Sequence, residues 1–99
     1  MLTIDKKVET GKALLMPKGR LDMLTAQEMK DAVDAVLPEA KELIFDFKDL
    51  EYISSAGLRV LMSAYKAMNM QGEMKLCNVN ETIMEILEVT GFSDVLTIE

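Results

Sequence analysis

The sequence has no histidine, no tryptophan and only one cysteine, Cys77, among its 99 residues. Without histidine the usual general base near neutral pH is missing, which excludes Ser–His–Asp and Cys–His catalytic pairs. One cysteine with dispersed carboxylates makes neither an internal disulfide nor a zinc site. No Gly-x-x-x-x-Gly-Lys loop is present for a nucleotide. A carboxylate pair stays open, but no spacing singles one out. We therefore expect a protein that is not an enzyme and has neither metal nor cofactor.

Positive charge and long apolar runs are also scarce. Eleven Lys and Arg residues stand against 17 Asp and Glu residues, which gives a formal net charge of -6. Such an acidic chain is poorly suited to a nucleic-acid backbone or an anionic membrane. No apolar run approaches the length that spans a membrane, and no secretory leader pattern opens the chain. With its unpaired cysteine, the chain is expected in the reducing cytoplasm, without nucleic-acid partner or membrane insertion.

Proline and glycine are few as well, two and five, whereas 49% of the residues are hydrophobic. This composition is typical of a folded domain, and we expect a single domain over residues 1–99. Hydrophobic periodicity and turn residues predict strands at 2–8, 12–17, 43–47, 74–78 and 95–98, with helices after 25, 54 and 80. The order β-β-α-β-α-β-α-β predicts an α/β fold with a mixed, mainly parallel sheet and crossover helices.

The helix starts carry capping signals. Thr25 is expected to be an N-cap, and Glu28, three residues later, completes a capping box. Leu24 and Met29 occupy the positions of a hydrophobic staple around this start. Asn80 is expected to cap the last helix in the same way.

The most informative segment is the run from Lys48 to Leu58, which connects strand 43–47 to a helix. In open α/β sheets, binding sites lie outside the carboxyl ends of the strands, and this loop holds Asp49, Ser54 and Ser55. A helix N-terminus presents free N–H groups and favours negative charge. A hydroxyl there caps the helix, contacts an anion or becomes an anion by phosphorylation, and the residues alone leave these three possibilities open.

Two motifs in this chain resemble those of the STAS domains (sulphate transporter and anti-sigma factor antagonist). Gly19-Arg20-Leu21-Asp22 is similar to the Gly-Glu-Leu-Asp that ends the opening hairpin of the family, with arginine in place of glutamate. Ser54-Ser55-Ala56-Gly57-Leu58 is similar to the family's Asp-Ser-Ser/Thr/Ala-Gly-Leu helix start, with serine in place of aspartate. The order of elements agrees over essentially the whole chain, and the likeness extends to the free-standing bacterial anti-sigma factor antagonists.

The resemblance implies a binding protein that is switched by phosphorylation. In that group, an anti-sigma factor with serine kinase activity phosphorylates the serine two positions before the motif glycine. That position is Ser55 here, with Ser54 as the alternative. The unmodified form would bind the anti-sigma factor and release a sigma factor, and a serine phosphatase would reset the switch. The implied partner surface comprises Asp22, Asp49, Ser54, Ser55, Ala56, Gly57 and Arg59.

Other interpretations of the same residues stay open. Asp22 and Asp49 are equally well ordinary turn formers. Gly57 in a first helical turn suggests close approach of a partner, or else packing against the sheet. The chain as a whole has an alternative role as a STAS accessory or scaffold subunit of a transport or signalling complex, whose serine is not a switch. A gene neighbourhood with a kinase-like ATPase and a sigma factor would favour the antagonist.

Overall fold

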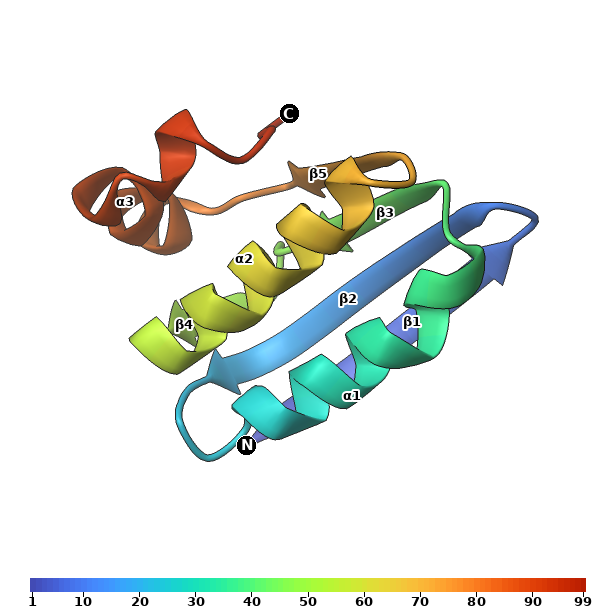
Figure 1. Cartoon of the computed structure of the whole chain (residues 1–99). Helices are drawn as coiled ribbons and strands as arrows, with labels where there is room; N and C mark the ends of the chain where they lie inside the picture. The colour runs from blue at the N-terminus through green and yellow to red at the C-terminus, as the bar shows by residue number, and fades with distance from the viewer.

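The computed structural model describes residues 1–99, which form five strands and three helices. In chain order they are β1 (Leu2–Glu9), β2 (Lys12–Leu21), α1 (Ala26–Val36), β3 (Glu42–Asp46), β4 (Leu50–Ile53), α2 (Ser55–Asn69), β5 (Glu73–Cys77) and α3 (Glu81–Thr90) (Figure 1). Short 3-10 turns follow α1 and α3. The mixed α/β fold expected from the sequence is confirmed.

The sheet has the order β1-β2-β3-β5, and β4 also pairs with β2. β1 and β2 form the expected antiparallel hairpin, in which Glu9 lies opposite Lys12 and Gly11 takes a positive φ of 74° in the turn. β3 and β4 both run parallel to β2, one after the other along the same edge. The long strand β2 therefore organises the sheet from end to end.

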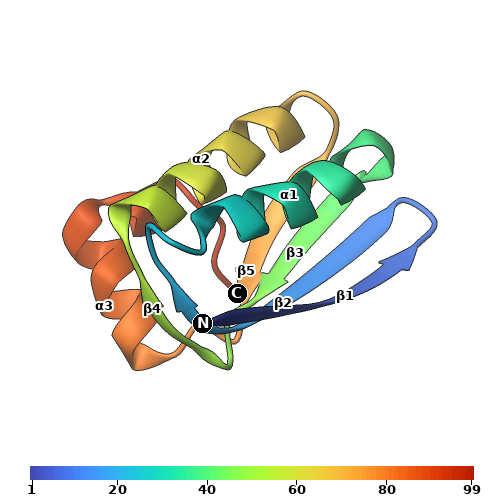
Figure 2. The same ribbon diagram turned by 90° about the horizontal axis from the view of Figure 1, so that it is seen from below.

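Helices α1 and α2 lie side by side over one face of the sheet, and α3 lies beyond its end, next to β4 (Figure 2). β2 sends Ala13, Leu15 and Leu21 into the layer beneath the helices, where all three are buried. The helices pack apolar stripes against this layer, and these stripes include Met29 of α1 and Leu61 of α2. One continuous apolar core fixes the helix starts relative to the strand ends.

The structure corrects three strand predictions. Residues 50–53, expected as part of a loop, form β4, because Leu50 and Ile53 are buried while Leu21 and Ile53 pair across the strands. Residues 95–98, expected as a strand, make one isolated bridge between Leu76 and Ile98. The N–H groups of Val95 and Leu96 donate to the Phe92 carbonyl oxygen at the end of the 3-10 turn, so they are not available for pairing with a strand. β2 also runs four residues further than expected, to Leu21.

The capping prediction for the last helix is confirmed. The Asn80 side chain accepts a hydrogen bond from the Ile83 N–H at 3.0 Å, and Gly91 ends α3 with a φ of 83°. No helix in this fold combines the length and the apolar character that a bilayer crossing requires.

Candidate functional site

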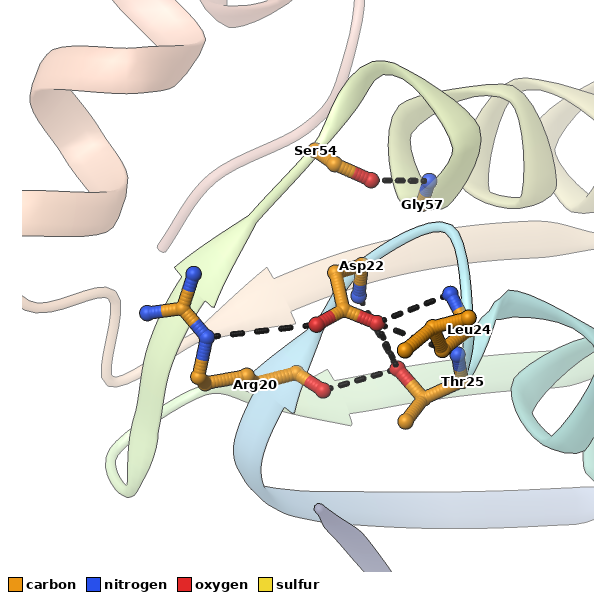
Figure 3. Close-up of polar contacts among 6 residues, drawn as sticks. All are labelled: Arg20, Asp22, Leu24, Thr25, Ser54 and Gly57. Carbon is orange, nitrogen blue, oxygen red and sulfur yellow. Dashed lines mark hydrogen bonds and ion pairs between the residues drawn. The ribbon is translucent and has the colours of Figure 1, made fainter.

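The candidate site lies where β2 and β4 end side by side. Leu21 pairs with Ile53, and the Ser54 N–H donates to the Leu21 carbonyl oxygen at 2.8 Å. Beyond this bond, one chain segment turns into α1 and the other into α2, so the two helix starts are neighbours (Figure 3). Residues that lie about thirty positions apart in sequence thus share one edge of the sheet, as expected for the carboxyl ends of parallel strands.

The two serines at the start of α2 have different roles. Ser54 is the N-cap, with an extended backbone, and its Oγ accepts a long hydrogen bond of 3.4 Å from the Gly57 N–H. Ser55 is the first residue of the helix, is exposed, and its hydroxyl makes no hydrogen bond within the chain. One serine therefore satisfies the backbone, and the other presents a free hydroxyl to solvent.

The loop before α1 is held by a closed set of hydrogen bonds. The Asp22 carboxylate accepts from the backbone N–H groups of Leu24 at 2.9 Å and Thr25 at 3.2 Å. The Thr25 hydroxyl donates to the Arg20 carbonyl oxygen at 2.8 Å and accepts from the Asp22 N–H at 2.9 Å (Figure 3). Thr25 is buried, and this network joins the end of β2 to the start of α1.

This network overturns the capping prediction for α1. Thr25 holds the N-cap position, but its backbone is helical and its side chain makes no capping bond. Its hydroxyl is already used by the end of β2. Glu28 forms no capping box, and Leu24 is 86% exposed, so it forms no staple with the buried Met29. The backbone of Leu24 is held by the hydrogen bond from its N–H to Asp22, and not by packing of its side chain on Met29.

Asp22 is shaped electrostatically by the same contacts. Burial alone would raise the pKa of its carboxyl group, but hydrogen bonds from Leu24 and Thr25 and the nearby Arg20 charge together lower the pKa below its ordinary value of 3.8. The Arg20 Nε lies 3.9 Å from the carboxylate. Asp22 therefore stays ionised at neutral pH, in a role that is first of all structural.

Arg20, the residue that replaces the family's glutamate, is held by β4. Its guanidinium carbon lies 4.4 Å from the centroid of the Tyr52 ring, a cation–π contact of about 0.5–1 kcal/mol at an exposed position. The two residues are partners across the β2–β4 pairing. Sequence reasoning missed this contact, because it requires knowledge that residues 50–53 form a strand beside β2.

The remaining expected partner residues divide into two groups. Ala56 is half-buried in the first turn, and the exposed Arg59 lies one turn beyond Ser55 on α2. Gly57, in contrast, is buried and faces the core. A Cβ there would lie 2.7 Å from Leu21 Cγ and 2.9 Å from Ile53 Cγ1. The idea that this glycine leaves room for a partner is wrong, because the space lies between α2 and the sheet.

Asp49 is the residue that the structure separates from the others. It lies in the turn before β4, where its carbonyl oxygen accepts from the Gly19 N–H at 3.1 Å. The whole of β4 stands between it and Ser54, a span of about 16 Å at the usual rise of a strand. The single loop expected to hold Asp49 and the serines is therefore wrong, because Asp49 and Ser55 lie at opposite ends of β4.

The start of α2 is electrostatically suited to a negatively charged group. The first turn of α2 contains no acidic residue, whereas the first turn of α1 contains Glu28 and that of α3 contains Glu81. The N-terminal dipole of α2 is thus left without a negative partner. No group of three or more His, Cys, Asp or Glu side chains gathers anywhere in the chain as a metal site.

The chain is similar to known proteins along its whole length. The anti-sigma F factor antagonist of Paenibacillus polymyxa is 26% identical over 98% of this chain and 86% of its own. The crystal structure of an anti-sigma factor antagonist from Mycobacterium paratuberculosis matches with a TM-score of 0.89, at 20% identity over 99% of this chain and 85% of that one.

The phosphorylated form of the Bacillus cell fate determinant SpoIIAA matches with a TM-score of 0.74, at 14% identity over 100% of this chain and 91% of that one. At such identities the two structures establish the fold alone. The family model for the STAS domain matches residues 3–99. From its fold, its two motifs and this match, the chain belongs to the STAS domain family.

Proposed function

We propose that this protein is an anti-sigma factor antagonist that is controlled by phosphorylation of Ser55. In its unmodified form it binds an anti-sigma factor through the edge that carries Ser55, and the bound sigma factor is released. The names of its relatives support this role. The chain acts as the substrate and ligand of its partner, not as an enzyme, and the exchange takes place in the cytoplasm.

The observation that carries this proposal is that Ser54 caps α2 while the Ser55 hydroxyl is exposed and unbonded. Because Ser54 caps α2, the Ser55 hydroxyl has no structural duty and is exposed. Modifying it costs the fold no hydrogen bond. Phosphorylation of Ser54 would instead disturb the only side-chain cap of α2. Ser55 is therefore the better acceptor on physical grounds.

Phosphate at Ser55 would act differently on the free and the bound protein. It adds about 1.5 to 2 negative charges at neutral pH. In the free domain, the unpaired N–H groups of the first turn and the Arg59 charge one turn along stabilise these charges. In the bound state, the same charges would lose their water at a surface made for close contact. Phosphorylation thus favours dissociation.

The partner must supply the chemistry of the transfer. The Ser55 oxygen attacks the γ-phosphorus of ATP, its proton passes to a base, and ADP leaves. The chain has no histidine, and the base belongs to a kinase domain of the anti-sigma factor. A serine phosphatase completes the cycle by hydrolysing the phosphate ester with water.

The test mixes the purified protein with an anti-sigma factor kinase encoded beside its gene. The expected result is a stable complex without ATP and transfer of one phosphate with ATP, located on Ser55 by mass spectrometry. Ser55→Ala should abolish the transfer, and the matched control Ser54→Ala should retain it. Ser55→Asp should weaken binding by roughly tenfold or more.

Two outcomes would contradict the proposal. A Ser55→Ala variant phosphorylated as fast as the unaltered chain would assign the acceptor elsewhere. If no kinase adjoins the gene and the protein instead co-purifies with transporter subunits, it is a scaffold or accessory subunit without a phosphorylation switch.

A further inference from the structure

Two large apolar side chains stand almost fully exposed in the loop beside the start of α2. Comparable exposure is found at Met1, the first residue, at 97%, and at Met70 and Val89, at 90% and 82%. At the edge itself, Met23 is 79% and Leu24 is 86% exposed. Both lie in the loop between β2 and α1, the neighbour of the Ser54 turn through the bond from Ser54 N–H to Leu21 O.

The exposure of Leu24 is imposed by the loop. A leucine just before an N-cap often packs back onto the first turns of the helix, which here would bring it against Met29. Here the Asp22 carboxylate holds the Leu24 N–H, and the buried Thr25 hydroxyl ties the next residue to the end of β2 (Figure 3). The loop thus presents Met23 and Leu24 outward on a fixed backbone. A surface held in its binding shape loses little conformational freedom when a partner covers it.

We infer that Met23 and Leu24 are the apolar anchors by which the anti-sigma factor grips this protein while Ser55 reaches its ATP. This inference rests on the proposed function. It commits to one occupant: an apolar pocket on the kinase, on the rim of its ATP cleft. The pocket must adjoin that cleft because the two loops are joined at their base by a backbone hydrogen bond of 2.8 Å.

The charges around the anchors fit this occupant. Arg20 is engaged by Tyr52 and Asp22, and Asp22 by the loop backbone, so the two charged groups at the base of this loop are partnered inside the chain. An incoming apolar surface therefore meets two uncommitted hydrophobic side chains and need not strip water from Arg20 or Asp22 without their partners. Well-packed anchors of this kind carry most of the energy of an interface.

The experiment compares two double variants of the full chain. Met23→Ser with Leu24→Ser removes the proposed anchors, and Met70→Ser with Val89→Ser removes apolar side chains of equal exposure elsewhere. Binding to the kinase without ATP is measured by calorimetry, phosphorylation by its KM and kcat, and folding by the unfolding midpoint. The anchor variant should bind at least about tenfold more weakly and raise KM with kcat unchanged, whereas the control variant should match the unaltered chain.

Each alternative outcome is distinct. If the unaltered chain binds and is phosphorylated, but the anchor variant does so equally well, the inference is wrong and the proposed function stands. If the unaltered chain neither binds nor accepts phosphate, the proposed function fails and the inference with it. If the unaltered chain forms a dimer that the anchor variant abolishes, and kinase binding is unchanged, the anchors serve a second copy of this chain. Equal unfolding midpoints of the variants exclude misfolding as the cause.

Discussion

The two helix starts at the carboxyl edge of the sheet use similar residues for opposite purposes. At α1, the Thr25 hydroxyl is buried and bonded on both sides, to Arg20 and to Asp22. At α2, the Ser55 hydroxyl is exposed and bonded to nothing in the chain. Thr25 is at the N-cap position of α1, and Ser55 directly follows the N-cap of α2. In the sequence both look like capping residues.

The comparison separates structural from chemical hydroxyl groups. A hydroxyl that is buried and bonded stabilises the fold and is out of reach of a kinase. A hydroxyl that is exposed and free contributes nothing to folding and is available for modification. The capping pattern looks only forward into the helix, whereas the Thr25 hydroxyl bonds backward to Arg20 at the end of β2 and to Asp22 just after it.

The largest stability effect we expect is at Thr25. Thr25→Val keeps the shape but leaves the Arg20 carbonyl and the Asp22 N–H without their partner at a buried position. An unsatisfied buried group costs about 1–3 kcal/mol. Denaturant unfolding should show this loss, whereas Ser55→Ala should stay within about 0.5 kcal/mol of the unaltered chain. Equal effects of the two substitutions would remove the contrast between the helix starts.

A smaller loss is expected at Gly57. An added methyl group meets Leu21 and Ile53 at less than 3 Å, which costs about 1–3 kcal/mol, while alanine gains about 1 kcal/mol as a helix former. Gly57→Ala should therefore lower the free energy of unfolding by about 1 kcal/mol. In a Leu21→Ala background the same change should cost less, because part of the overlap is gone. A more stable Gly57→Ala variant would show that this packing argument is wrong.

Phosphorylation should produce a smaller change of opposite sign. Phosphate on Ser55 should stabilise the free domain by about 0.3–1 kcal/mol through the N-terminus of α2, with about 0.2–0.5 kcal/mol from Arg59 at the i+4 position. Arg59→Gln should remove only the second part, and the control Lys66→Gln, in the last turn of α2, should remove neither. Thermal unfolding of phosphorylated and unmodified protein measures the gain, which added salt should weaken. A phosphate that destabilises the free domain would contradict this account.

The smallest effect concerns Asp22 and pH. Since the folded state lowers the pKa of this carboxyl group, its contribution is complete above the ordinary value of 3.8 and is lost as the pH falls through the lower folded pKa. The stability difference between the unaltered chain and Asp22→Asn should therefore be constant near neutral pH and should shrink in acid. Denaturant titrations across this range provide the measurement. A difference that grows in acid would mean that Asp22 is held in its protonated form.

Much of the fold could be predicted because its signals are local. The hairpin, the α2 and α3 starts and the stop at Gly91 all depend on residues within about four positions of one another. β4 was missed because four residues are too few for a clear alternation, and its partner β2 lies about thirty positions away. The bridge at Ile98 was mistaken for a strand because apolar alternation does not report whether a neighbouring strand is within reach.

For the candidate site the same distinction holds. The sequence by itself determined that two serines stand at the start of a helix that follows a strand. Its motifs led to the STAS family, which the family match confirms. The acceptor role of Ser55 stays a prediction. Only the tertiary structure decided that Thr25 is locked, that Gly57 faces the core, that Asp49 lies apart and that Leu24 is exposed. The reason is physical: Gly57 and Asp49 depend on neighbours that pairing of β2 with β4 brings across the sheet, and for Thr25 and Leu24 a spacing of a few residues does not state whether a group turns back to the strand or forward to the helix.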